Sequence, residues 1–308
     1  MRWTSPILQT DMDFEKAREE VNRALEACIS EELRDAPSSI AAPIQYAVLS
    51  PGKRIRPLLV IASWEAVRGG SVEDTKPALY RLACAPELVH AYSLIHDDLP
   101  CMDDDNLRRG RPTVHVSFGV RGATLAGGAL MPLAVGTIGS AADELGVGLD
   151  IKTEMIKTLV VASGGAGMVG GQLLDIEAEG GQVDLHTLEE IHLGKTARLI
   201  SASCVIGALA AGGGTAVIER LANYGLKVGL AFQAIDDILD VIGSTEKLGK
   251  FGGRDQVLGK VTTPSVLGLS GAKKRAEQLG DEAILELDLL PDSEGLHQIT
   301  RLILDRDR

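Results

Sequence analysis

Apolar side chains recur at helical spacing along most of this chain of 308 residues. Over residues 13–34, apolar positions three or four apart are separated by charged ones, which predicts an amphipathic helix. Residues 42–49 lead into a loop, SPGKRIRP, and a new helix is expected from about Pro57, because proline is tolerated in a first helical turn. Further helices, with glycines marking the breaks, are expected over residues 78–98, 151–162, 188–211, 216–242 and 272–290.

Two long uncharged stretches, residues 122–142 and 199–218, have the length of membrane spans. The first contains Pro132 and five glycines, and the second ends near three consecutive glycines. Both are weakly hydrophobic for bilayer segments, so we expect no membrane span and interpret them as closely packed central helices. The pattern therefore predicts one all-α domain over residues 1–308, a bundle of about ten helices around a few very apolar ones.

Composition and net charge limit the fold class, the partners and the compartment of this protein. Aromatic residues make up only 3% of the chain, and strand-like runs are hard to find, which favours helices. The net charge of −12 argues against a nucleic-acid partner, and an anionic substrate would need a locally basic pocket. The four cysteines form no CxxC pair and the N-terminus lacks an apolar signal-peptide core, which predicts free thiols and a cytoplasmic protein.

The second acidic cluster along the chain lies within a predicted apolar helix, in the segment FQAIDDILD. Asp236 and Asp240 are four residues apart and lie on one helix face, with Asp237 beside them. A solvated acidic face would carry Lys, Glu or Gln around it, whereas nearly every other residue here is apolar. Because burying carboxylates without cations is costly, this cluster predicts a cation site.

The first acidic cluster along the chain, in LIHDDLPCMDDDNLRRGRP, has a different geometry. Asp97 and Asp98 should close the preceding helix, and Asp103 follows six residues later. Six residues is the wrong spacing for a shared face, so the helix must bulge or break near Pro100. An EF-hand loop starting at Asp103 is excluded, because Val114 stands where the bidentate glutamate would be needed.

Two aspartate clusters with no histidine or cysteine among the candidate ligands favour a hard cation with oxygen ligands. Magnesium is usually shared between one or two carboxylates and substrate phosphates, so clusters facing each other across a cavity would hold several ions and a diphosphate. Basic residues at glycine-marked turns or beside the acidic clusters suit phosphate recognition. They are Lys53, Arg56, Arg108, Arg109, Lys195, Lys250 and Lys260. The GKT at 194–196 is not a P-loop, because Glu189 replaces its first glycine.

SPGKRIRP and the two acidic segments resemble, in their order along the chain, the basic loop and the two aspartate-rich motifs of the trans-isoprenyl diphosphate synthases. GMVGGQLLDIEAEG resembles the segment between the two acidic motifs. The likeness runs from about residue 45 to 268. It implies an isoprenoid-synthase-type bundle around a central apolar cavity, a homodimer, and an enzyme that joins an allylic diphosphate to isopentenyl diphosphate.

The resemblance also implies roles for individual residues. Asp97 and Asp103 would ligate two Mg²⁺ and Asp236 a third. Supporting catalytic roles fall to Asp98, Asp237, Asp240 and Lys195. The implied allylic diphosphate ligands are Arg108, Lys195, Thr196, Gln233 and Lys250, and those of isopentenyl diphosphate are Lys53, Arg56, His90 and Arg109.

Product length is implied by the residues below the first acidic cluster. Tyr92 and Ser93 lie about one turn beneath Asp97, and a bulky tyrosine there would cap the tunnel early and favour a C15 product. The segment AYSLIHDDLP is similar to bacterial farnesyl diphosphate synthases. A packing tyrosine without control over length, a C20 synthase, a class I terpene cyclase and a non-catalytic synthase subunit remain open as alternatives.

Overall fold

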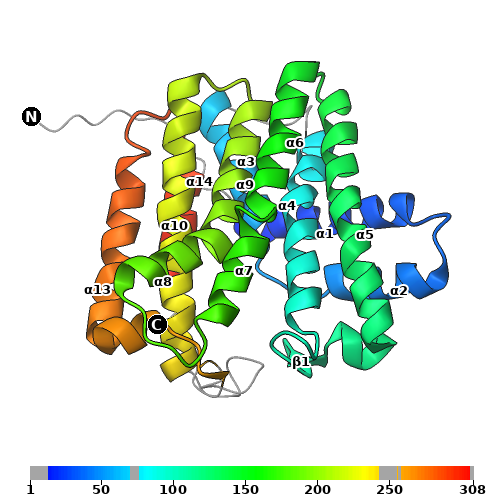
Figure 1. The fold of residues 1–308 in the computed structure, drawn as a ribbon. Coiled ribbons are helices and arrows are strands. Elements are labelled where there is room, and N and C mark those ends of the chain that lie inside the picture. The colour runs from blue at the N-terminus through cyan, green and yellow to red at the C-terminus, as the bar shows by residue number, and fades with distance from the viewer. Residues whose placement is uncertain (1–12, 70–75, 243–254, 256–257, 306–308) are drawn as a thin grey trace, which may run out of the picture.

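The computed structural model describes residues 13–69, 76–242, 255 and 258–305. Helices dominate this part of the chain (Figure 1). The helices are α1 Phe14–Glu32, α2 Ser38–Val48, α3 Ile55–Arg68, α4 Lys76–Asp97, α5 Val114–Glu144, α6 Leu149–Ser163, α7 Met168–Glu177, α8 Leu185–His192, the π-helical turn η1 Leu193–Ala197, α9 Arg198–Ala210, α10 Thr215–Ile242, α13 Thr263–Leu285 and α14 Glu294–Leu304. Two short strands, β1 Leu107–Arg108 and β2 Arg111–Pro112, form an antiparallel hairpin.

The long helices stand side by side across the molecule (Figure 1). Helix α5 packs along α4, α3 lies against α4 and α9, and α10 lies between α9 and α13. One core gathers around α1, α4 and α5, and a second joins α3, α9, α10 and α14. Tyr224 is fully buried in the second core and donates a hydrogen bond to the Leu296 carbonyl (2.8 Å), which ties α10 to α14.

The predicted all-α class is confirmed. Helix α5 contains the first uncharged stretch, and the second begins in α9 and runs into the start of α10; Ala126, Leu130 and Ile138 of α5 are buried in the first core. Within the described residues, three helical stretches are long and apolar enough to cross a membrane by length and composition: Val114–Glu144, Leu149–Glu177 and Leu185–Ala210. Each contributes buried residues to the bundle, as predicted for central helices.

The helix predicted over residues 188–211 is interrupted, and this is a correction. Helix α8 passes through the π-helical turn η1 before α9 begins. The extra residue in such a turn shifts the apolar face of the helix, but α9 is buried at nearly every position from Leu199 to Leu209, so the sequence there has little periodicity in which a shift could be detected. Helix α13, predicted over residues 272–290, also begins earlier, at Thr263, and contains a kink at Gly268 (φ 70°).

Candidate active site

The first acidic cluster begins where α4 ends. Helix α4 stops at Asp97, and the Asp103 amide donates a hydrogen bond to the Asp97 carbonyl (2.9 Å). The predicted break before Asp103 is therefore confirmed. It turns the chain back so that the two residues, six apart in sequence, lie together.

The negative charge of Asp97 is disfavoured by its surroundings. The pKa of the Asp97 carboxyl is raised to about 6, mainly by burial; Lys195 opposes this shift and the neighbouring Asp103 adds to it. A buried carboxylate next to a second one is stabilised by a nearby cation. This pair therefore has the electrostatic character expected of cation ligands.

Two lysines from distant segments reach this pair. Lys260 Nζ lies 2.9 Å from Asp103 Oδ1 and 3.5 Å from Asp175 Oδ2, and Lys195 Nζ lies 2.5 Å from the same Asp175 oxygen. Burial alone would lower the pKa of the Lys260 ammonium, but Asp175 and Asp103 raise it above its usual range. Lys260 follows the second acidic cluster in sequence, so it joins that part of the chain to the first cluster.

Asp175, on α7, is a site residue that the sequence interpretation missed. It is buried, and Lys195 and Lys260 lower the pKa of its carboxyl although burial alone would raise it. The signal was present in the sequence, because Asp175 is a single carboxylate inside the apolar run GGQLLDI. The reasoning applied to FQAIDDILD would have selected it.

The second acidic cluster has two buried members and one half-buried member, Asp236. Asp240 Oδ2 accepts a hydrogen bond from the Asp255 amide (3.2 Å). Among the described residues, Asp240 Oδ1 is buried without a hydrogen-bond partner. An unsatisfied buried carboxylate oxygen is costly, and a bound cation would satisfy it.

Asp237 has a structural environment that differs from the catalytic role implied by the resemblance. Its carboxylate accepts hydrogen bonds from Gln233 Nε2 (2.9 Å), Thr263 N (2.8 Å) and Thr263 Oγ1 (2.9 Å). Thr196 Oγ1 donates in turn to Gln233 Oε1 (2.8 Å). Asp237 thus anchors the start of α13 and holds in place two residues, Thr196 and Gln233, that are predicted to bind diphosphate.

Asp98 binds Arg108 across the chain reversal. Arg108 Nε lies 2.9 and 3.0 Å from the two Asp98 oxygens, and Arg108 Nη2 lies 2.6 Å from Oδ1. Arg108 is less buried than its partner, so the guanidinium keeps an open edge while Asp98 fixes its direction. This geometry makes Asp98 a positioning residue for Arg108.

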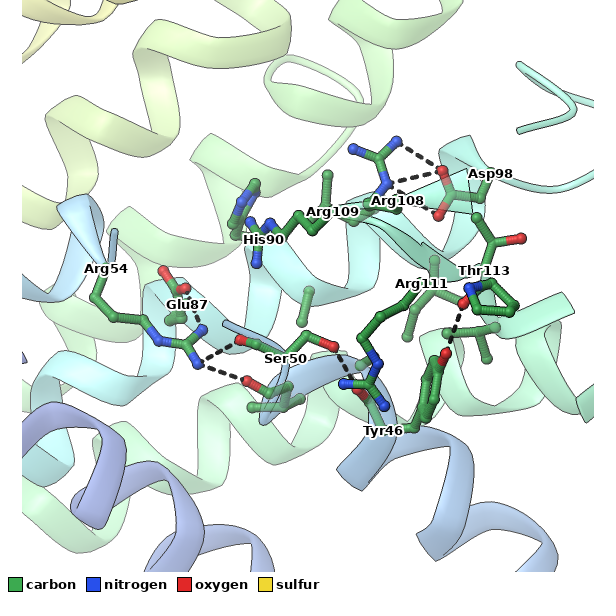
Figure 2. A pocket seen from close by; sticks show the side chains of 17 residues that line it. Tyr46, Ser50, Arg54, Glu87, His90, Asp98, Arg108, Arg109, Arg111 and Thr113 are labelled. Atoms are coloured by element: carbon green, nitrogen blue, oxygen red, sulfur yellow. Dashed lines mark hydrogen bonds and ion pairs between the residues drawn. The ribbon is translucent and has the colours of Figure 1, made fainter. Parts of the chain in front are cut away.

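A pocket of about 530 Å³, including the space open to solvent, lies beside this ion pair (Figure 2). Arginines dominate its polar wall, together with His90 and Glu87. Its lining includes Tyr46, Ser50, Arg54, Glu87, His90, Asp98, Arg108, Arg109, Arg111 and Thr113. The pocket brings together the predicted residues His90, Arg108 and Arg109. The central apolar cavity implied by the resemblance stays a prediction.

His90 is held in its neutral form. Burial and the neighbouring arginines, Arg56 foremost, lower the pKa of its imidazole well below the usual range. A neutral imidazole can donate one hydrogen bond to an anion and accept another without adding charge. The cationic charge of this pocket therefore comes from its arginines.

Arg54 builds the basic loop and was also missed by the sequence interpretation. It adopts a left-handed conformation (φ 54°) immediately before α3. Its buried guanidinium bonds Glu87 (2.9 Å), Asn22 (2.9 Å) and the carbonyls of Val48 and Ser50 (3.1 and 2.8 Å). SPGKRIRP thus contains one structural cation, and sequence alone does not distinguish it from its neighbours.

The remaining predicted residues of the basic loop lie close to this pocket or between the two regions. Arg109 donates a hydrogen bond from Nη1 to the Pro51 carbonyl (2.6 Å), which brings β1 to the loop. Arg56 is half-buried and interacts electrostatically with both Glu87 and Asp236, so it lies between the pocket and the second acidic cluster. Lys53 is exposed, and Lys250 lies outside the described residues.

The residues predicted to set product length lie on the last turns of α4. Tyr92 is half-buried, and its ring meets that of His96 edge to face, with centroids 4.7 Å apart. The Ser93 hydroxyl donates to the His90 carbonyl (2.9 Å). Tyr92 is therefore fixed by a contact to its own helix, and Ser93 is bonded to the backbone.

The donor set fits magnesium in one particular way. In the described part of the chain, no three His, Cys, Asp or Glu side chains converge closely enough to hold a metal ion by themselves. Magnesium commonly binds through one or two carboxylates and completes its shell with water and substrate phosphate oxygens. The Asp97–Asp103 pair and the unsatisfied Asp240 oxygen match that arrangement.

Comparisons with known proteins agree with this geometry. The sequence model of the family described as polyprenyl synthetase matches residues 37–287. The chain is 45% identical over 300 residues to farnesyl diphosphate synthase of Escherichia coli K12, covering 92% of this chain and 98% of the relative. It is also 45% identical over 266 residues to large subunit 1 of a chloroplastic heterodimeric geranylgeranyl pyrophosphate synthase of Arabidopsis thaliana, covering 85% and 70%.

Solved structures give the same result. An FPP/GFPP synthase from Zymomonas mobilis superposes with a TM-score of 0.82 at 34% identity, covering 94% of this chain and 99% of that one. A geranyltransferase from Helicobacter pylori, solved in complex with magnesium and isoprenyl diphosphate, gives 0.79 at 32% identity, covering 99% and 98%. The chain belongs to the polyprenyl synthetase family. Within it, the chain is an enzyme of the trans-prenyltransferase class, as the sequence predicted.

Proposed function

We propose that this enzyme condenses isopentenyl diphosphate with an allylic diphosphate, dimethylallyl or geranyl, in a magnesium-dependent reaction. The observation that carries the proposal is the presence of two separate places for a diphosphate. Asp97, Asp103, Lys195 and Lys260 form one, where carboxylates alternate with ammonium groups. The arginine-lined pocket around His90 forms the other.

The residues of the first place suit the departure of a diphosphate. Magnesium bound by Asp97, Asp103 and Asp236 would act as a Lewis acid toward the oxygens of the leaving diphosphate. Lys195 and Lys260 place two ammonium groups beside these carboxylates, where they stabilise the negative charge that develops. Thr196 and Gln233, already bonded to each other, present an ordered polar edge to the same group.

The second substrate has to deliver its double bond to the allylic carbon as the diphosphate leaves. Arg109 and His90, with Arg56 between the two regions, suit the diphosphate of isopentenyl diphosphate. A new carbon–carbon bond then forms, and loss of a proton to the departed diphosphate restores the double bond. The apolar helices exclude water, which would otherwise trap the allylic cation as an alcohol.

Farnesyl diphosphate (C15) is the product we propose. Tyr92 supports this length, because its bulky ring lies one turn below Asp97 and is fixed by His96. The matched relatives also include geranylgeranyl pyrophosphate synthases, so C20 is the second candidate. Replacing Tyr92 by alanine should lengthen the product, and unchanged C15 output would remove Tyr92 from this role.

The decisive experiment incubates the pure protein with Mg²⁺, isopentenyl diphosphate and allylic primers of different length. We expect prenyl diphosphates one or more isoprene units longer than the primer, detected by mass spectrometry. Asp97→Ala and Asp236→Ala should abolish turnover with the fold intact by circular dichroism. Asp104→Asn, an exposed carboxylate of the same loop, is the matched control and should keep turnover. Near-normal activity in either alanine variant would refute the metal assignment.

We further infer a cytoplasmic homodimer. Helices α5 and α6 expose apolar side chains on neighbouring surfaces: Leu125 on α5 (54% exposed), and Val160 and Val161 on α6 (47% and 54%). Each copy carries a net charge of −12, and two such molecules repel except through an uncharged face. The same face on a second copy is therefore the occupant we propose.

A further inference from the structure

His96 lies in a gap that only glycine can provide. An ideal Cβ built on Gly127 of α5 would lie 2.3 Å from His96 Nε2 and 2.4 Å from Cδ2. Real Cβ atoms do not approach other heavy atoms this closely. The imidazole therefore packs directly onto the backbone of α5, where its Nε2 is 3.2 Å from the Thr124 carbonyl.

The same imidazole also contacts Tyr92. The two rings are four residues apart on α4 and meet edge to face, at 4.7 Å and 64°. Such aromatic pairs have a preferred geometry, so the position of one ring restricts the other. His96 thus forms a bridge between the backbone of α5 and the ring of Tyr92.

We propose that Gly127 and His96 are positioning residues for product length. Gly127 leaves room for the imidazole against α5, and the imidazole holds the Tyr92 ring in the orientation that closes the product tunnel. The inference rests on the proposed function, because it assigns a cause to the position of the tunnel floor. Neither residue belongs to the aspartate pairs or to the diphosphate-binding sets described above.

A methyl group at position 127 separates these contacts. The imidazole has to leave the surface of α5, and it cannot keep both the Thr124 contact and the Tyr92 stack. The ring is the far end of a flexible side chain, so it can rotate away while both helix backbones stay in place. Alanine also favours helix more than glycine, so we expect Gly127→Ala to fold.

The test measures the fraction of product that is one isoprene unit longer than the product of the unaltered chain. We expect Gly127→Ala to raise this fraction at least threefold, with Gly139→Ala as the control. Gly139 is also on α5, but a Cβ there meets nothing within 4 Å. His96→Ala should raise the same fraction, and Gly127→Ala should add nothing to it, because the ring that clashes is gone.

Variants made in the Tyr92→Ala background show whether Gly127 affects product length through Tyr92 or by another contact. If Gly127 acts through Tyr92, then Gly127→Ala changes the product ratio in the unaltered chain but not in Tyr92→Ala. An equal rise in both backgrounds, or no rise in a folded Gly127→Ala enzyme, overturns the inference. An unchanged product length in Tyr92→Ala also overturns the inference, but it leaves the proposed condensation reaction untouched. Failure of the unaltered chain to condense any primer contradicts the proposed function instead.

Thermal unfolding shows whether Gly127→Ala folds. If it does not, His96→Ala, measured with and without Tyr92→Ala, tests the inference. His96→Ala that keeps the product length of the unaltered chain contradicts the inference. A shift that is lost in the Tyr92→Ala background supports it.

Discussion

Asp175 holds two ammonium groups with one carboxylate oxygen. Lys195 and Lys260 come from segments 65 residues apart, yet both contact Asp175 Oδ2 (2.5 and 3.5 Å). Lysine is a flexible point charge, so its direction depends on its partner. Asp175 therefore sets where the two positive charges lie relative to Asp97 and Asp103.

Replacing Asp175 by asparagine should reduce both stability and turnover. Lys260 is nearly buried, and removing one partner of a buried charge pair leaves an under-compensated cation. We expect the free energy of unfolding to fall by about 2 kcal/mol, and kcat/KM to fall about 10- to 100-fold. Denaturant titration and steady-state kinetics measure the two effects. Asp288→Asn, at an exposed position, is the control and should change neither.

His192 makes folding depend on pH. Burial lowers the pKa of its imidazole from 6.5 to about 4 in the folded protein. Between these values the unfolded chain binds a proton that the folded protein does not, so stability falls as pH decreases through this window. We expect the unaltered protein to lose about 2 kcal/mol more than His192→Gln between pH 7 and pH 4.5. Urea titrations at both pH values measure the difference, and equal losses would show that His192 does not contribute.

At the scale of elements, the turn η1 and helix α7 meet backbone to backbone. A Cβ on Gly171 would lie 2.0 Å from the Lys195 amide nitrogen, and one on Gly194 would lie 2.8 Å from the Gly171 Cα. Backbone cannot rotate away as a flexible side chain can. The contact fixes the register between the helix that carries Asp175 and the turn that carries Lys195.

Gly171→Ala should therefore separate α7 from η1. We expect a loss of about 1 to 3 kcal/mol in the free energy of unfolding, as for other overpacked positions. Gly139→Ala, with open space around its Cβ, should be neutral or slightly stabilising. Thermal or urea unfolding compares the two variants, and similar stabilities would show that α7 and η1 can yield.

The sequence predicted most helices because apolar periodicity is a property of single elements. It selected Asp236 as a candidate because a carboxylate in an apolar helix is conspicuous, and Asp97, Asp103 and Arg108 because acidic and basic residues are crowded into one short segment; their roles stay predictions. It did not predict the π-helical turn, because the helix that follows is buried at nearly every position and has little periodicity, or the separate structural tasks of Asp237 and Arg54. Those tasks depend on which atom a side chain meets, as with Asp237 and the Thr263 amide, and spacing does not encode that.

For the whole molecule, the exposed apolar face of α5 and α6 should decide the state of association. We expect light scattering after gel filtration to give twice the mass of one chain, 32.5 kDa. Val161→Asp places a charge on that face and should shift the protein toward the single chain. Leu289→Asp, at an even more exposed position near the C-terminal end, should leave the mass unchanged. A monomer before any substitution would contradict the dimer.

The hydrogen bonds of Arg54 have a consequence for the rate at which a diphosphate binds. Because this guanidinium is saturated by Glu87, Asn22 and two carbonyls, the loop around it already has its final shape. The protein therefore loses little conformational entropy when a diphosphate binds to this loop. Association at that end of the molecule should follow diffusion and ionic strength, with no slow rearrangement of the loop to wait for.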